Sequence, residues 1–236
     1  MIEIENVSKH FGRLHVLKGV QLSCGPGQCI ALIGPNGCGK TTLIKSILGM
    51  VIPSSGRILY KGEDIARDFR YRHSIGYMPQ KGRYPENMTI GQVIDMIRDI
   101  RGPKVNRDEE LIEAFGLRDM YDKRMRTLSG GTTQKVSASL AFLFDPEVLI
   151  LDEPTAGLDP LAAEILKDKI IAEHQRGKLI FITSHLLSEL DELVTHVVLM
   201  QEGEIRFNMP SAELKERTGM NSLARAITYV LKQDHV

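Results

Sequence analysis

Residues 34–42 read Gly-Pro-Asn-Gly-Cys-Gly-Lys-Thr-Thr, and this stretch decides the fold class. It fits the pattern G-x-x-x-x-G-K-[ST], follows a short apolar run at 29–33, and opens a helical pattern that Gly49 is expected to end. Glycines at these positions let backbone N–H groups turn inward around phosphate oxygens, where a β-carbon would collide. The stretch therefore predicts a strand, a phosphate-binding loop and a helix in that order.

The residues of this loop predict an ATP site with Mg²⁺. Lys40 is expected to reach the β- and γ-phosphates, and the hydroxyl of Thr41 to ligate Mg²⁺. A glycine-rich turn that fits the pattern by accident is the alternative, and the flanking strand and helix patterns disfavour it. Cys38 lies inside the loop, so a thiol reagent there should block ATP. The predicted nucleotide-binding residues are Gly34, Pro35, Asn36, Gly37, Cys38, Gly39, Lys40, Thr41 and Thr42.

A second apolar run, at 148–151, ends in the acid pair Asp152-Glu153. The carboxyl end of a parallel strand is where open α/β sheets bind ligands. Adjacent residues on a strand point in opposite directions, so the two carboxylates can differ in role. Asp152 is expected to coordinate Mg²⁺, and Glu153 to polarise the water that attacks the γ-phosphate. On its own, the segment would read as a salt-bridged surface turn before Pro154.

The order of patterns along the chain predicts a mainly parallel α/β sheet with a helical insertion. Strand patterns fill most of the first third, and helical periodicity runs from about 85 to 144. Strand patterns then return at 148–151 and 178–183, on either side of a helix that begins at Asp159-Pro160. Strands at 197–199 and 205–207 are expected to pair as a hairpin.

Composition excludes several classes of protein. Apolar residues make up 42% and charged residues 25% of the 236 residues, as in globular domains. Lys plus Arg equals Asp plus Glu, at 30 each, so direct nucleic-acid binding by bulk charge is not expected. No run approaches the ~18–20 apolar residues of a membrane span, and the first residues lack a signal-peptide pattern. Three cysteines do not suggest a disulfide framework or a metal site.

Residues 128–132, Leu-Ser-Gly-Gly-Thr, give the pattern a family. They resemble the LSGGQ signature of ABC ATPases, which lies upstream of the acidic strand in that family. The other marks of the family stand in order, with an adenine-stacking aromatic at Phe11, Gln80 in Tyr-Met-Pro-Gln, Asp159 in Ala-Gly-Leu-Asp and His185 in Thr-Ser-His. The resemblance covers about residues 2–210. One departure is Thr132, which replaces the usual glutamine; the expected phosphate contacts come from Ser129 and the glycine amides, so an active site is still expected.

The resemblance implies a fold: a two-lobed ABC cassette of the P-loop NTPase class. Such a cassette has a RecA-like core with an antiparallel β subdomain, plus a helical insertion. The expected boundaries are 1–84 for the first part of the ATP-binding core, 85–144 for the helical subdomain with the signature, 145–215 for the second part of the core, and 216–236 for a short tail.

The resemblance also implies a head-to-tail homodimer that holds two ATP molecules at its interface. Ser129, Gly130 and Gly131 would reach the γ-phosphate held by the second copy of the chain, and Asp159 would contact the interface besides capping a helix. The implied catalytic residues are Glu153, His185, Lys40 and Gln80. The implied metal ligands are Thr41, Gln80 and Asp152.

The implied function is ATP hydrolysis that powers transport through a separate transmembrane permease subunit. The alternative is a soluble ABC ATPase that acts on nucleic acid or the ribosome. The chain is expected in the cytoplasm, peripheral to the inner face of the membrane. The sequence around the acid pair, Asp-Glu-Pro-Thr-Ala-Gly-Leu-Asp-Pro, is similar to that of subunits of ABC-2-type exporters. Residues 75–87 resemble subunits linked to copper-site maturation of nitrous oxide reductase. Candidate residues for the groove that receives the permease are Tyr84, Pro85, Met88 and Ile90.

Overall fold

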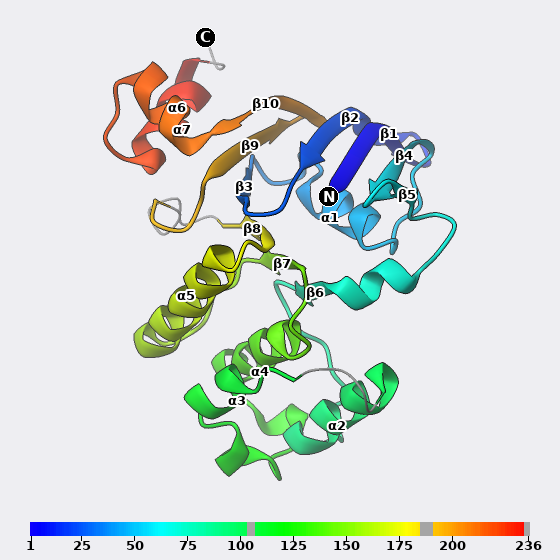
Figure 1. Cartoon of the computed structure of the whole chain (residues 1–236), viewed down its shortest axis with the longest axis vertical. Helices are drawn as coiled ribbons and strands as arrows, with labels where there is room; N and C mark the ends of the chain where they lie inside the picture. Colours follow the sequence, from blue (N-terminus) through cyan, green and yellow to red (C-terminus); the bar gives the residue numbers. More distant parts are fainter. Residues whose placement is uncertain (103–106, 185–190, 234–236) are drawn as a thin grey trace. The chain divides into compact units, whose positions relative to one another are not determined.

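The computed structural model describes residues 1–102, 107–184 and 191–233. The chain folds into two compact units (Figure 1). The first consists of Met1–Arg72 and His174–Val236, and the second of His73–Glu173. Each unit is described in turn.

An antiparallel sheet forms the first part of the first unit. Its strand order is β2 (Leu14–Cys24), β1 (Ile2–Phe11), β4 (Ser55–Tyr60) and β5 (Glu63–Asp64). The alternation predicted from the sequence is present, because Ile2, Ile4 and Val7 are buried and their immediate neighbours are more exposed. Ile4 lies opposite Leu22 of β2 and Ile58 of β4. One apolar face of this sheet is therefore continuous across three strands.

A second set of strands in the first unit carries the phosphate-binding loop. Strand β3 (Cys29–Ile33) pairs in parallel with β8 (Leu179–Thr183) on one side and β9 (His196–Gln201) on the other. Strand β10 (Glu204–Pro210) pairs antiparallel with β9, as the hairpin prediction requires. Every residue of β3 and β8 is buried, which explains their unbroken apolar sequence. Helix α1 (Lys40–Ile47) follows the loop after β3.

Two helices close the described part of the first unit. They are α6 (Ser211–Thr218) and α7 (Leu223–Gln233), drawn beside β10 in Figure 1. Leu223, Ala226 and Ile227 of α7 are buried. Their i, i+3, i+4 spacing is that of one helix face, although the sequence analysis expects only a tail there.

In its described residues, the second unit combines a parallel strand pair with four α-helices. Strand β6 (Ile75–Met78) pairs in parallel with β7 (Val148–Asp152), with Tyr77 opposite Ile150. A β-carbon on Gly76 would stand 2.0 Å from the Ala141 carbonyl oxygen, so glycine is what lets β6 lie against this helix backbone. The helices are α2 (Ile90–Arg101), α3 (Glu110–Ala114), α4 (Gly130–Phe142) and α5 (Pro160–Gln175). Short 3₁₀ turns lie at Arg70–Ser74, Arg118–Met120 and Met125–Thr127.

An ion cluster around a buried lysine joins α5 to the start of α3. The ammonium of Lys169, only 5% exposed, lies 2.6 Å from carboxylate oxygens of Asp108 and Glu110 and 3.0 Å from Glu173. Paired charges of this kind raise the pKa of Lys169 against the effect of burial. No helix within the described ranges is long and apolar enough to cross a bilayer.

Candidate nucleotide site

The loop after β3 has the backbone that the glycine pattern predicts. Gly37 and Gly39 have φ of 82° and 109°, in the region that favours glycine. Gly34 has φ of 147°, and a β-carbon there would stand 2.1 Å from the Met200 carbonyl oxygen. The loop therefore runs against the backbone of β9, and any larger residue at 34 would push it away.

Backbone amides at the start of α1 remain for a ligand. The first bond of the helix runs from the Leu43 N–H to the Gly39 carbonyl, at 2.8 Å, and Gly39 brings no side-chain cap. The amides of Lys40, Thr41 and Thr42 precede this bond and have no partner within the helix. Such a helix start attracts anions through its amides and its dipole.

Lys40 places a positive charge over the same loop. Its ammonium donates to the carbonyl oxygens of Gly34, at 2.6 Å, and Pro35, at 3.1 Å. It also lies 3.9 Å from the Cys38 sulfur, which is buried. A flexible cation folded over loop carbonyls can exchange them for phosphate oxygens, which are stronger acceptors.

The β9–β10 turn is hydrogen-bonded to the phosphate-binding loop. The Gly203 N–H donates to the Cys38 carbonyl at 3.1 Å, and the Gly203 carbonyl accepts from the Lys18 N–H at 2.9 Å. A β-carbon on Gly203 would stand 2.5 Å from the Val16 carbonyl oxygen. The sequence predicts a turn at Glu202-Gly203 but not this contact, because the turn and the loop lie far apart in the sequence.

Phe11 lies at the tip of the β1–β2 hairpin, opposite Leu14. Its side chain is 50% exposed, and the Lys9 ammonium lies 5.0 Å from the ring centroid. The rings of His10 and His15 stack beside it with centroids 3.8 Å apart. An exposed ring on a hairpin held in this way is available to stack on a base.

In the second unit, the acid pair begins where β7 ends. Asp152 is the last residue of the strand and is 9% exposed. Burial and, to a lesser degree, the charge of Asp152 raise the pKa of Tyr77 to about 12, so the Tyr77 phenol stays neutral. The strand-alternation argument stops at this point, because Glu153 leaves the strand with a left-handed φ of 55°.

Two hydrogen bonds to the Glu153 carbonyl oxygen hold its strained backbone in place. That oxygen accepts from the Ala156 N–H at 3.1 Å and from the Gln134 side-chain amide at 3.4 Å. A non-glycine residue with positive φ costs free energy and tends to be found at functional sites. Glu153 therefore has a fixed, left-handed backbone, whereas Asp152 ends the strand.

The signature segment forms the start of α4. Ser129 is the N-cap, and its hydroxyl accepts the Thr132 N–H at 3.2 Å. Gly130 and Gly131 are the first helical residues. Gly130 has open space where a β-carbon would stand, whereas a β-carbon on Gly131 would lie 2.7 Å from the Gly157 carbonyl oxygen.

Asp159 connects the same helix to α5. Its carboxylate lies 2.7 Å from the Lys135 ammonium and accepts the Ala162 N–H at 2.9 Å, so its predicted N-cap role is present. The hydrogen bond from Lys135 and the Ala162 amide lower the pKa of Asp159. Lys135 and Gln134 are contacts of the site that the sequence analysis does not find, although both follow the signature directly.

The structure distributes the predicted residues over both units. The loop at 34–42 and Phe11 belong to the first unit, and Gln80, the acid pair, the signature and Asp159 to the second. Within the second unit, α4 contacts the turns after Glu153 and Gly157. Gln80 is exposed in a bend shortly after β6. His185 lies outside the described residues.

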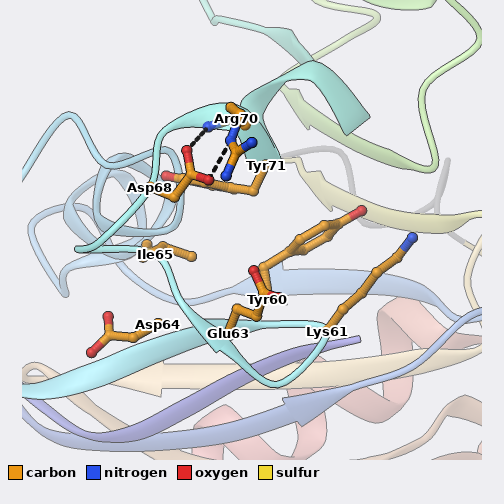
Figure 2. Close-up of a pocket in the computed structure, with 8 residues that line it drawn as sticks. All are labelled: Tyr60, Lys61, Glu63, Asp64, Ile65, Asp68, Arg70 and Tyr71. Carbon is orange, nitrogen blue, oxygen red and sulfur yellow. Dashed lines mark hydrogen bonds and ion pairs between the residues drawn. The ribbon is translucent and has the colours of Figure 1, made fainter.

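A cavity in the first unit is lined by residues outside the phosphate-binding loop. It measures about 360 Å³ and lies beside the β4–β5 hairpin (Figure 2). Tyr60 and Tyr71 line it, and Asp68 and Arg70 pair with each other at its edge, 2.5 Å apart. Its residues are Tyr60, Lys61, Glu63, Asp64, Ile65, Asp68, Arg70 and Tyr71.

Together, a glycine loop that opens a helix and an acid at the end of a buried strand define a P-loop nucleoside triphosphatase. The family model of the ABC transporter matches residues 17–156. This chain therefore belongs to the ABC transporter family, as its ATP-binding, ATP-hydrolysing subunit.

Known proteins are similar over nearly the whole chain. A Nod factor export ATP-binding protein I of Rhizobium sp. (strain N33) is 32% identical over 92% of this chain and 74% of its own length. An uncharacterized ABC transporter ATP-binding protein, YhaQ of Bacillus subtilis (strain 168), is 33% identical over 94% and 76%. The solved structure of an ATP-binding subunit of an ABC transporter superposes with a TM-score of 0.89, at 26% identity over 98% of this chain and 99% of that one. The predicted α/β cassette fold is confirmed.

The residues present fit ATP and Mg²⁺, the ligands of this family. Glycine at 34 lets the loop lie directly against the backbone of β9, because a β-carbon there would collide with it. The amides at the start of α1 and the Lys40 ammonium are donors for phosphate oxygens. Thr41 in the first unit and Asp152 in the second each carry an oxygen atom of the kind that Mg²⁺ prefers, as the predicted ligand set requires.

Proposed function

We propose that two copies of this chain close head to tail around two ATP molecules. Each reaction centre then combines the loop at 34–42 of one copy with the signature of the other. The observation that carries this proposal is the exposed Ser129-Gly130 start of α4, with a hydroxyl and helix amides at its surface. It is a second helix start suited to an anion, besides that of α1.

The two helix starts would contact the triphosphate from opposite sides. The loop of one copy holds the β- and γ-phosphates, and the partner's Ser129, Gly130 and Gly131 reach the γ-phosphate from the other side. ADP lacks the γ-phosphate and loses the second set of contacts. ATP binding therefore favours the closed dimer and hydrolysis the open one, a population shift driven by differential contacts.

Hydrolysis is assigned to residues around the γ-phosphate. Glu153 polarises the attacking water, a role that typically contributes ~10²–10⁴-fold. Its left-handed backbone, fixed by two hydrogen bonds to its carbonyl, supports a defined carboxylate position. His185 is proposed to contact the γ-phosphate and orient Glu153, which rests on the sequence Thr-Ser-His.

Metal and base binding are assigned to four further residues. Thr41, Asp152 and Gln80 would hold Mg²⁺, directly or through water. Bound Mg²⁺ would supply positive charge that neutralises the charge developing on the phosphates. Phe11 would stack on adenine, an interaction worth ~1–3 kcal/mol per base and less for a partly wet ring.

A permease helix is proposed to dock in a cavity of the second unit. The cavity measures about 300 Å³, and its lining includes Tyr84, Phe144 and the cations Arg83 and Arg101. Burial raises the pKa of Tyr84, so its hydroxyl stays neutral. Of the predicted groove residues, Tyr84 lines the cavity, whereas Ile90 is fully buried and belongs to the core.

The docking proposal predicts that Arg83→Glu weakens co-purification with the native permease. Lys81→Glu is the matched control, because it makes the same charge change two residues away, outside the cavity lining. Equal recovery of the permease with both variants would contradict the assignment.

Export is the proposed direction of transport, because curated relatives are named for export. In that case the chain works at the cytoplasmic face of the membrane and reaches it through the permease. The narrower assignment to nitrous oxide reductase copper maturation rests on residues 75–87 and stays a prediction.

The dimer proposal is tested with Glu153→Gln, which should bind ATP but hardly turn it over. Size-exclusion chromatography with light scattering should show a dimer with ATP and Mg²⁺, and a monomer with ADP. Adding Ser129→Arg should abolish the dimer while calorimetry shows unchanged ATP affinity. A persistent dimer in the double variant would remove the signature from the interface.

A further inference from the structure

Thr132 stands at the position where the ABC signature has glutamine, and its side chain contacts the N-cap. Its Oγ1 lies 2.9 Å from the Ser129 Oγ. The Ser129 Oγ also accepts the Thr132 backbone N–H at 3.2 Å. Two groups of one residue therefore meet the hydroxyl that the proposed function directs at the γ-phosphate.

Helix α2 of the same chain shows what a glutamine does at this position. Thr89 is its N-cap, and Gln92 occupies N3, the position that Thr132 has in α4. The side-chain Oε1 of Gln92 accepts the backbone N–H of Thr89 at 2.9 Å, and the Thr89 hydroxyl accepts the backbone N–H of Gln92. In this capping box the glutamine side chain bonds to the backbone of the N-cap and not to its hydroxyl.

The shorter side chain of Thr132 bonds to the hydroxyl instead. A β-branched side chain has one rotatable bond to order, whereas glutamine has three. The contact with Ser129 therefore fixes its direction at a low entropic cost. Thr132 is half-buried, which further limits its alternatives.

The numbers of hydrogens and lone pairs on the Ser129 and Thr132 hydroxyls decide which of them donates to the other when a phosphate is bound. A hydroxyl has one hydrogen and two lone pairs. One lone pair of Ser129 already accepts the Thr132 amide. A phosphate oxygen accepts only, so the Ser129 hydrogen must point to it. The remaining Ser129 lone pair then accepts the hydrogen of the Thr132 hydroxyl.

We propose that Thr132 is a positioning residue for the γ-phosphate: its hydroxyl donates to Ser129 Oγ and thereby directs the Ser129 hydrogen toward the phosphate held by the partner copy. This inference rests on the proposed role of Ser129. Hydrogen bonds in such a chain polarise and strengthen one another. The departure from the usual signature is thus a working part of the ATP-dependent interface.

The test measures the dimer dissociation constant in the Glu153→Gln background with ATP and Mg²⁺. Thr132→Val keeps the shape but removes the hydroxyl, and one neutral hydrogen bond corresponds to roughly a threefold loss per site. The dimer has two such sites, so its dissociation constant should rise about tenfold. Thr132→Ser should restore the value of the parent. Binding of ATP to the isolated protomer should not change.

Thr133→Val is the matched control. Its Oγ1 bonds to the Ser129 backbone carbonyl at 3.1 Å and does not touch the Ser129 hydroxyl. It removes a threonine hydroxyl from the same turn, so the dimer constant should stay within twofold of the parent, about the scatter of a repeated measurement. If Thr132→Val lowers the melting temperature more than Thr133→Val, Thr132→Ala provides the same comparison.

Ser129→Ala separates this inference from the proposed function. Weakening by Ser129→Ala but not by Thr132→Val or Thr132→Ala overturns the positioning role of Thr132. No weakening by Ser129→Ala overturns the role of Ser129 itself. When both act, adding Thr132→Val to Ser129→Ala should cause no further loss, because the two residues work through one hydroxyl. Additive losses would also overturn the inference.

Discussion

Replacing Gly131 by alanine should separate the packing of the signature helix from its contact with phosphate. The new β-carbon would lie 2.7 Å from the Gly157 carbonyl oxygen. A comfortable C···O contact is about 3.3 Å, so the turn at Gly157 must move by roughly 0.6 Å. Overpacking costs about 1–3 kcal/mol, and we expect the lower end because Gly157 is exposed and its turn can shift.

Gly130→Ala provides the matched comparison. A β-carbon at Gly130 meets nothing within 4 Å in the protomer, so the fold should keep its stability. In the proposed dimer, the same carbon would stand against the partner's phosphate. Both variants should therefore lose ATPase activity, but for different reasons.

Thermal unfolding of the nucleotide-free protomer distinguishes the two variants. For a domain of this size, 1 kcal/mol corresponds to about 2–4 °C, so Gly131→Ala should melt about 2–6 °C below Gly130→Ala. Equal melting temperatures would refute the contact between the signature helix and the Gly157 turn.

Three further outcomes follow from the described contacts. Gly34→Ala should lower ATP affinity about 10- to 100-fold, measured by calorimetry, because its β-carbon would meet a backbone oxygen of β9; unchanged affinity would argue against the loop. N-ethylmaleimide should label Cys38 before the other two cysteines, whose pKa burial raises to about 12, and ATP should slow the labelling seen by mass spectrometry; labelling that ATP does not affect would place Cys38 outside the site. Lys169→Met should cost about 3–5 kcal/mol in urea unfolding because it removes a buried ammonium that lies within 3.0 Å of three carboxylates, whereas Lys167→Met, whose ion pair is with the exposed Glu164, should cost under about 1 kcal/mol; equal costs would contradict the role of the buried lysine.

Elements with a local signal were predictable from the sequence. The glycines and Lys40 of the loop, the apolar run before Asp152 and the Asp159-Pro160 helix start each encode their structure in adjacent residues. The structure has the predicted strand, cap or turn at each of these places. Their physics is local, so a single sequence is enough.

Elements that depend on a distant partner were not predictable in the same way. Strand β6 has four residues, including Gly76, and becomes a strand by pairing with β7, about seventy residues away. Helix α7 did carry a signal, the apolar spacing of Leu223, Ala226 and Ile227, which the sequence analysis did not use.

The same distinction holds for the site. The Gly203 N–H donates to the carbonyl of Cys38, a residue far away in the sequence, so no local pattern encodes that hydrogen bond. The left-handed backbone of Glu153 was also missed, since a strand ending in two carboxylates predicts continued alternation. Thr132 was noticed as a departure, but its bond to Ser129 needed coordinates.

Mixing two inactive variants tests the shared reaction centre most directly. Lys40→Ala removes the loop's lysine, and Ser129→Arg blocks the signature, so each protein alone should be inactive. In a mixed dimer, one site joins the intact loop of one copy to the intact signature of the other. Only the mixed dimer contains a complete reaction centre, at one of its two sites, so ATPase activity should reappear on mixing and reach at most about half of the unmodified protein's. A mixture as inactive as its components, or a Ser129→Arg protein that is active alone, would contradict the account.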